Sequence, residues 1–287
     1  MELKEQTINT PGYKTYMREF GSLNAFYNYI TTTPLNGTFQ WEELGSVKNG
    51  YSFSQTYSFE EATELFKDGW HSMADQLVKK LSVVKNQVVD TEVKKVLYDV
   101  VGFQASVPRY LQGIPTNMIN KRVVTVKQKV ITLDKDISYN CLTNTKQIIE
   151  ASTQVLLLIK KLEAQGIRVN LNLILGVKAG YTKEVVKVRI KSANERLNIS
   201  KLAFPLVHPS MLRRLFFRYI EVAPTVTKSY KWGYGKPLDG QELKQYTKDE
   251  YLLPRLFDGN ITQVGDPSTI CNLTAKIVNG KNDAPKI

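Results

Sequence analysis

The residues best suited to do chemistry in this chain are basic ones that recur on the polar side of predicted strands and helices. Lys and Arg number 39 against 27 Asp and Glu, so the formal net charge is +12. A surface of this charge attracts phosphate groups, and binding to a nucleic acid through its phosphates weakens steeply as salt rises. The residues expected to form that surface are Lys127, Lys129, Lys187, Arg189, Lys191, Arg213, Arg214 and Arg218.

A second candidate contact lies in residues 228–236, where aromatic and basic residues alternate. Tyr230, Trp232 and Tyr234 stand among lysines that include Lys231. Aromatic rings on which bases stack, mixed with positive charge, are typical of proteins that bind single strands. We therefore predict nucleic acid as the partner and leave DNA and RNA open. For each element the alternative is an ordinary solvated face or a packed loop.

No motif in the chain indicates an enzyme. Neither a Gly-x-x-x-x-Gly-Lys-Ser/Thr loop nor a Gly-x-Gly-x-x-Gly loop occurs, so the usual phosphate-binding turns are missing. Two cysteines, Cys141 and Cys271, and two histidines are too few and too widely spaced for a zinc framework. Neither cysteine has a nearby histidine to activate it. We expect no catalytic residue, no cofactor and no metal.

The elements that must position these residues form an α/β unit, with α+β as the alternative class. Apolar and basic residues alternate from residue 122 to about 134, which predicts a strand. Apolar residues surround the predicted helix at 143–162, so that helix must be buried, and Gly166 suits its C-terminal end. Alternation resumes at 167–175 and at 186–191, which predicts two strands joined as a hairpin. The order is strand, helix, strand, strand.

Three regions follow along the chain. Residues 1–57 are rich in aromatics without a period, which predicts packing against the rest of the fold or an arm for assembly. Residues 58–223 hold a helical layer and the α/β core, and residues 224–287 an irregular extension packed on it. The layer is expected to begin at a capping box at Ser58, with one helix to residue 81 and a second over 91–101. Another helix is expected to start at Pro209.

Two stretches carry a resemblance to known proteins. Asp134-Lys135-Asp136-Ile137-Ser138 at the end of the first core strand resembles the Asp-x-Ser-x-Ser metal loop of von Willebrand A-like folds. Together with Leu202-Ala203-Phe204 and the segment from His208 to Leu215, it is similar to an uncharacterised phage and mobile-element family with a degenerate, cobaltochelatase-subunit-like core. The resemblance implies such an origin and no reaction. Lys135 places positive charge where a cation would bind, so we expect no functional metal.

The function expected from these features is that of a non-enzymatic phage or mobile-element protein that binds nucleic acid through a basic surface. The alternative is a structural or assembly protein, of a virion or another oligomer, whose terminal extensions contact neighbouring subunits. The N-terminus has no apolar leader, and the longest apolar run, residues 155–159, is too short to cross a bilayer. We expect a cytoplasmic location in the host cell, or the virion, and no membrane partner.

Overall fold

The computed structural model describes residues 3–39, 44–82, 92–125, 129–139, 143–230, 233–247 and 251–253. The strands are β1 (Leu3–Thr10), β2 (Tyr13–Phe20), β3 (Glu92–Asp99), β4 (Gln104–Ala105), β5 (Met118–Thr125), β6 (Val130–Asp136), β7 (Arg168–Ala179), β8 (Thr182–Lys191), β9 (Lys236–Pro237) and β10 (Tyr251–Leu253). The helices are α1 (Leu23–Thr32), α2 (Gly45–Lys48), α3 (Tyr51–Ser54), α4 (Phe59–Asp68), α5 (His71–Leu81), α6 (Val107–Leu111), α7 (Thr145–Ala164), α8 (Ile199–Val207), the π-helix η2 (Met211–Phe216), α9 (Phe217–Val222), the 3-10 helix η3 (Lys228–Tyr230) and α10 (Gly240–Lys244). The predicted α/β class is confirmed.

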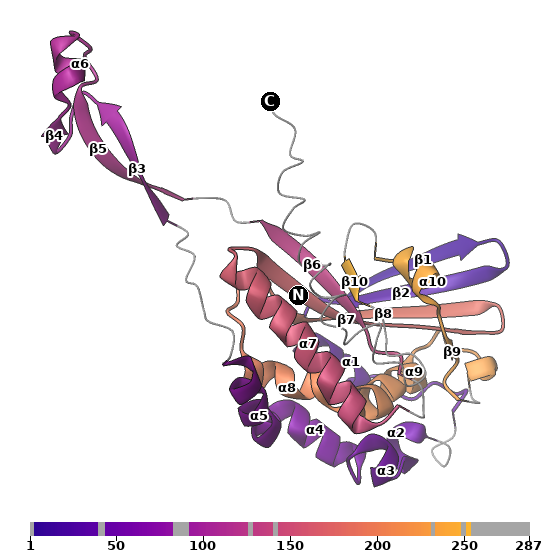
Figure 1. Ribbon diagram of the computed structural model, residues 1–287. Coiled ribbons are helices and arrows are strands. Elements are labelled where there is room, and N and C mark those ends of the chain that lie inside the picture. Colours follow the sequence, from indigo (N-terminus) through magenta and orange to yellow (C-terminus); the bar gives the residue numbers. More distant parts are fainter. Residues whose placement is uncertain are drawn as a thin grey trace.

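The main sheet has the order β1-β2-β8-β7-β6-β10, and β9 pairs with β7 (Figure 1). β2 runs parallel to β8, and β6 runs parallel to both β7 and β10, whereas β1 with β2 and β7 with β8 are antiparallel hairpins. The predicted order of strand, helix, strand, strand is confirmed as β6, α7, β7 and β8. Gly180 makes the hairpin turn with a φ of 58°.

Helix α7 packs against strand β7 of this sheet. It begins after Asn144, whose side-chain oxygen accepts from the backbone of Gln147 while the Gln147 side chain accepts from the backbone of Asn144. Gly166 follows its end with a φ of 76°, the left-handed conformation that favours glycine. Leu156 and Ile159 are fully buried, so the expectation of a buried helix is confirmed.

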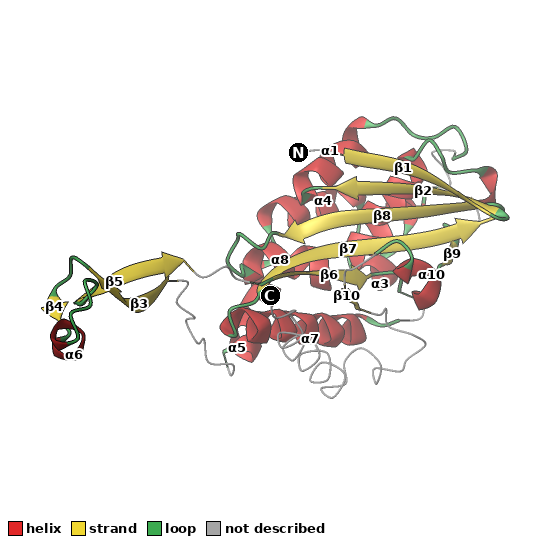
Figure 2. Cartoon of the chain, turned by 90° about the horizontal axis from the view of Figure 1, so that it is seen from above, coloured by secondary structure: helices red, strands yellow, loops and turns green. Residues whose placement is uncertain are grey.

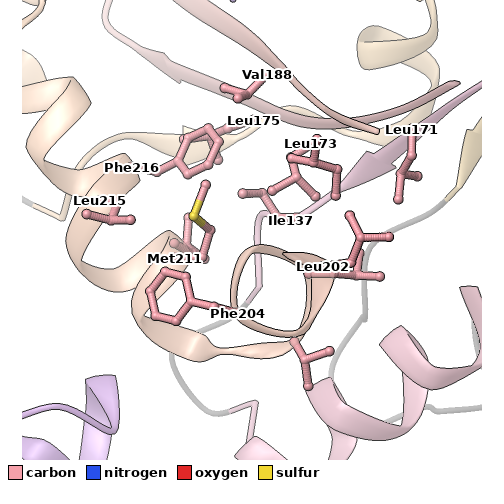
Figure 3. Close-up of a cluster of buried hydrophobic side chains, with 14 of the residues drawn as sticks. Ile137, Leu171, Leu173, Leu175, Val188, Leu202, Phe204, Met211, Leu215 and Phe216 are labelled. Atoms are coloured by element: carbon pink, nitrogen blue, oxygen red, sulfur yellow. The ribbon is translucent and has the colours of Figure 1, made fainter. Parts of the chain in front are cut away.

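The large core lies between one face of the sheet and the helices that cover this face (Figure 2). Side chains of β7 meet those of α8 and η2 there, as Leu173, Phe204 and Met211 show in Figure 3. The opposite face carries a smaller core between the strands and α10. Its members are Met17, Ile174, Val185, Leu238, Leu243 and Tyr246.

Several predicted elements are wrong in extent or type. The helix expected from residue 58 to 81 ends at Asp68, because Gly69 has a φ of 88° and cannot continue it. The helix expected over residues 91–101 is wrong, because residues 92–99 form strand β3. The single strand expected from residue 122 is two strands, since β5 and β6 belong to different sheets.

The aromatic side chains of Phe20 and Phe26, in β2 and α1, pack within the fold. β2 lies between β1 and β8, and the ring of Phe20 lies 5.3 Å from that of Phe26 in α1. Ser58 caps α4 by accepting from the backbone N–H of Glu61 at 3.1 Å. The Glu61 carboxylate accepts from the backbone of Tyr57 at 2.6 Å, one residue before the position of an ideal capping box.

Candidate interaction surface

The three arginines expected on an outer helix face are buried. Arg213, Arg214 and Arg218 are 3%, 0% and 8% exposed. The expectation assumed that one side of this helix faces water. Instead α2, α3 and α4 pack against η2, so protein covers the side that carries the arginines. The expected basic surface on this helix is therefore corrected.

Arg214 holds the short helices of this layer in place. Its guanidinium donates to the backbone oxygens of Ser46, Val47, Asn49 and Thr56 and to the Thr56 hydroxyl, at 2.6 to 3.0 Å. The five N–H groups of a guanidinium match this set of acceptors. Burial lowers the pKa of Arg214, and nearby Glu61 and Glu60 oppose that effect. The residue is structural.

The three basic residues of β8 that were predicted as contacts lie in three different environments. Lys187 is buried, with its Nζ 3.0 Å from a carboxylate oxygen of Asp134. Lys191 turns towards α7, where its Nζ lies 2.6 Å from Glu163. Arg189 alone of the three is exposed, and its Nε donates to Asn172 at 3.4 Å. The alternating pattern of this strand therefore does not form a basic face.

The other predicted contacts do not form one surface either. Lys127, Lys231 and Trp232 lie outside the described residues, and Lys129 is half-buried. Tyr230 is buried and donates from its hydroxyl to the backbone of Thr182 at 3.0 Å. Tyr234 stacks on Phe217 with ring centres 4.2 Å apart. Both described tyrosines serve packing, in line with the alternative stated for this segment.

The segment from Asp134 to Ser138, which the sequence predicted as a loop, is the end of strand β6 and the two residues after it, and it is buried. Asp134 accepts from the amide of Asn172 at 2.7 Å besides its ion pair with Lys187. One carboxylate oxygen of Asp136 accepts from both the backbone and the hydroxyl of Ser138. Among the described residues no group of three or more His, Cys, Asp and Glu side chains could hold a metal ion.

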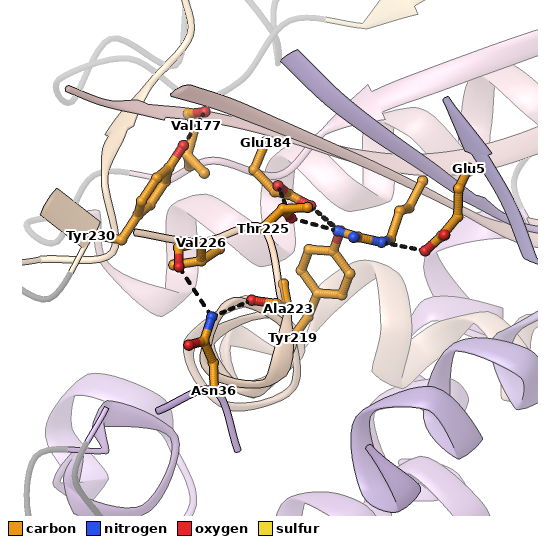
Figure 4. A network of polar contacts seen from close by, with 10 residues as sticks. Glu5, Asn36, Val177, Glu184, Tyr219, Ala223, Thr225, Val226 and Tyr230 are labelled. Atoms are coloured by element: carbon orange, nitrogen blue, oxygen red, sulfur yellow. Dashed lines mark hydrogen bonds and ion pairs between the residues drawn. The ribbon is translucent and has the colours of Figure 1, made fainter. Parts of the chain in front are cut away.

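A buried polar network joins the N-terminal hairpin to α9 (Figure 4). Arg18 of β2 bonds to Glu184 of β8, to Glu5 of β1 and to the hydroxyl of Tyr219. Thr225 completes it by donating to Glu184 at 2.8 Å. Burial raises the pKa of Glu184, and the charge of Arg18 opposes that effect. The donors and acceptors of these side chains pair with one another, so the network stabilises the fold.

The feature that stands out on the surface is a projecting arm, residues 92–125, formed by β3, β4, α6 and β5. Both views show it apart from the main sheet and the helical layer (Figures 1 and 2). Of the fourteen exposed large apolar side chains among the described residues, eight lie on this arm. They are Leu97, Tyr98, Val100, Val101, Phe103, Val107, Tyr110 and Leu111, from 39% to 77% exposed.

The arm is nevertheless ordered by its own contacts. Its three strands pair antiparallel in the order β3-β5-β4. Arg109 of α6 donates to the backbone of Thr116 at 2.9 Å, and its guanidinium lies 4.4 Å from the ring centre of Tyr98. A Cβ at Gly102 would lie 2.3 Å from the backbone oxygen of Ile119, so only glycine permits this close approach. The apolar side chains are thus presented on a defined scaffold.

A family model for a domain of unknown function, DUF7192, matches residues 4–277. The chain belongs to the DUF7192 family. The match spans the main sheet, the helical layer and the arm, so the arm lies inside the family domain. Searches of curated proteins and of solved structures found no match. No described helix of this DUF7192 protein combines the length and apolar character needed to cross a membrane.

Sequence reasoning missed the arm in this family member because it assigned residues 91–101 to a helix. A usable signal was present. Val100, Val101 and Phe103 follow one another around Gly102 without helical spacing, and Pro108, Gly113 and Pro115 come soon after. Apolar residues between such breaks cannot form one face of a long helix. Their exposure, however, depends on the arm's distance from the body, which no local pattern reports.

Proposed function

We propose that this protein is a non-enzymatic assembly protein whose arm contacts other protein subunits. The observation that carries the proposal is the concentration of eight exposed apolar side chains on the arm. Large exposed apolar patches on a soluble protein commonly mark a surface that contacts another protein. A three-stranded sheet without a covering layer also gains little burial of its own.

The chemistry of the arm favours a protein partner over a nucleic acid. Five of its eight exposed apolar residues are aliphatic: Leu97, Val100, Val101, Val107 and Leu111. Burial of aliphatic side chains against a dry apolar surface is favourable, because it removes them from water. Bases offer ring faces that suit aromatic and cationic groups better. The contact is therefore assigned to protein, within a host-cell complex or a virion.

The experiment is to change the arm without disturbing the body. Val107 and Leu111 are 63% and 77% exposed, so Val107→Asp with Leu111→Asp removes apolar contact area while leaving the fold. We expect the wild-type chain to form an oligomer or a protein complex by light scattering, and the double variant to be monomeric. Tyr181→Asp is the matched control, because Tyr181 is 84% exposed on the β7–β8 turn. A monomeric wild-type chain without bound protein would contradict the proposal.

Nucleic-acid binding is the second candidate, and the net charge of +12 favours it. Reversal of Arg213, Arg214 and Arg218 would unfold the helical layer and cannot test it, since these residues are buried. Arg189→Glu changes an exposed cation and is the better variant. We expect weaker binding to all sequences and a smaller dependence on salt if this strand contacts phosphates. An unchanged affinity would exclude Arg189 from the contact.

An origin in a phage or mobile element and a von Willebrand A-like core stay predictions from the resemblance of the loop at Asp134. They are compatible with an assembly role, because neither requires a reaction. A solved structure of another DUF7192 member with a defined genomic context would test both.

A further inference from the structure

Strand β3 is an open edge of the arm. It pairs with β5 along all eight residues without a register shift, and among the described residues its other side has no strand neighbour. Proteins commonly protect such an edge with a proline, a bulge, a very short strand or charged residues, above all lysine. β3 contains no proline and no bulge, and its charged residues include Lys94 and Lys95. Its outer N–H and C=O groups are therefore a template for another strand.

Exposed apolar side chains lie at this edge and just beyond it. Leu97 and Tyr98 are 39% and 47% exposed, and Val100 and Val101 directly after the strand are 65% and 74% exposed. Successive strand residues point to opposite faces, so both faces of the edge carry apolar groups. A strand added here would satisfy the backbone groups and bury apolar side chains on both faces.

The sequence of β3 is complementary to itself in one two-fold register. When a two-fold axis normal to the sheet relates two antiparallel copies, each residue keeps its face of the sheet. Opposite residues must therefore both have odd numbers or both have even numbers. With the axis at Leu97, Leu97 meets its own copy and Lys95 stands opposite Asp99 on both sides. An axis at residue 95 would oppose two lysines, and axes at 96 and 98 would put an aliphatic residue opposite Asp99.

We propose that β3 pairs antiparallel with β3 of a second copy of this chain, with Leu97 on the two-fold axis. The inference rests on the proposed assembly function and names its partner. The arms of the two copies then form one sheet in the order β4-β5-β3-β3-β5-β4, a closed isologous contact. Charged residues on an edge strand discourage pairing with other strands. In this register the opposite charges of Lys95 and Asp99 meet, so the same charges favour this pairing over others.

Salt distinguishes this contact from nucleic-acid binding. Each chain carries a net charge of +12, so two copies repel at long range, and added salt screens that repulsion. Dimerisation should therefore strengthen as salt rises from low ionic strength, whereas phosphate binding weakens. If the absorbance ratio of the purified complex indicates bound nucleic acid and the complex weakens as salt rises, a nucleic acid is favoured as the partner over a second copy of the chain.

The decisive test is a cysteine at the axis. Residues opposite each other in an antiparallel pair have Cα atoms about 4.5 to 5.5 Å apart, within the range of a disulfide. Leu97→Cys in the full chain should give a covalent dimer under mild oxidation that reductant reverses. Tyr181→Cys is the matched control, because Tyr181 is 84% exposed on the β7–β8 turn, outside the arm. The unchanged chain controls for Cys141 and Cys271.

A charge exchange tests the register without cysteine. Lys95→Asp and Asp99→Lys should each weaken the dimer, and the two changes combined should restore it. If the Leu97→Cys chain crosslinks no better than the Tyr181→Cys chain, the β3 contact is wrong. Should that chain still assemble through Val107 and Leu111, the assembly function stands without it. A monomer in every form would overturn both.

Discussion

The guanidinium of Arg109 lies 4.4 Å from the ring centre of Tyr98 and connects α6 to strand β3 of the arm. The same guanidinium donates to the backbone and the hydroxyl of Thr116, at 2.9 and 3.1 Å. One side chain therefore fixes α6, β3 and the segment before β5 relative to one another. The geometry of the apolar tip depends on it.

Arg109→Ala should loosen the tip and leave the body intact. A cation over an aromatic ring contributes about 0.5 to 1 kcal/mol at an exposed site, and each hydrogen bond about 1 kcal/mol. We expect self-association weaker by about tenfold, which corresponds to about 1.4 kcal/mol. Hydrogen exchange should accelerate at residues 106–120 and stay unchanged in α7. Equal protection of the tip in both chains would contradict this role.

Leu156→Ala should destabilise the whole domain. Leu156 is fully buried in α7 between the sheet and the other helices. A leucine truncated in such a site costs about 2 to 5 kcal/mol of unfolding free energy. Denaturant unfolding measures the loss, with the half-buried Leu157 of the same helix as the control position. A loss below about 1 kcal/mol would place α7 outside the core.

Arg214→Ala should cost at least about 3 kcal/mol, because it leaves several buried backbone oxygens without donors. Arg214→Lys should recover little of this loss, since an ammonium has three donors and cannot reach all five acceptors. Arg189→Ala changes an exposed arginine and should alter the unfolding free energy by less than about 0.5 kcal/mol. Similar losses in both arginine variants would contradict a structural role for Arg214.

Lys135 makes stability depend on alkaline pH. Burial lowers the pKa of Lys135 from 10.5 to about 8, against the attraction of Asp136. Between these two values the unfolded chain binds a proton that the folded chain has lost, so stability rises with pH across this window. Below about pH 8 the full cost of the buried charge applies.

Lys135→Met should therefore stabilise the protein at pH 7 by about 1 to 3 kcal/mol. The advantage over wild type should shrink as the pH rises from about 8 to 10.5. Melting temperatures of both chains across this range measure it. A variant that is less stable than wild type at pH 7 would show that contacts of the Lys135 ammonium outweigh its desolvation.

Magnesium should leave the melting temperature of the protein unchanged. The carboxylate of Asp134 is paired with Lys187 at 3.0 Å and accepts from Asn172 at 2.7 Å. A ligand that binds only the folded state would raise the melting temperature. A rise with magnesium that is lost in Asp134→Asn would contradict this prediction and indicate a metal site.

The sequence was sufficient for the elements whose periodicity is local. The structure confirms three predictions that each depend on a single segment. They are the buried helix α7 with apolar residues on most sides, the strands β7 and β8 with alternating apolar and polar residues, and Gly166 at the end of α7. The buried arginines were not predictable in the same way. A helix pattern shows that Arg213 and Arg214 lie away from one apolar face, but it cannot show that α2 and α3 cover the other. Burial depends on contacts between distant segments.

The same limit explains why the predicted basic face of β8 does not exist. Lys187 and Lys191 alternate with valine and isoleucine, which is typical of a half-buried strand. Protein covers β8 at these two positions, where Lys187 meets Asp134 of β6 and Lys191 meets Glu163 of α7. Only knowledge of the paired strands and helices identifies these carboxylates as partners.

The parallel pairing of β2 with β8 has a consequence for synthesis on the ribosome. β2 ends at Phe20, but its neighbour β8 spans Thr182–Lys191, so β2 must wait until most of the chain has been made. At about 5 to 20 residues per second this delay is on the order of ten seconds. Until then the nascent chain exposes Phe20 and the face of the hairpin that later packs on α9. Chains interrupted before β8 should therefore depend on chaperones to stay soluble.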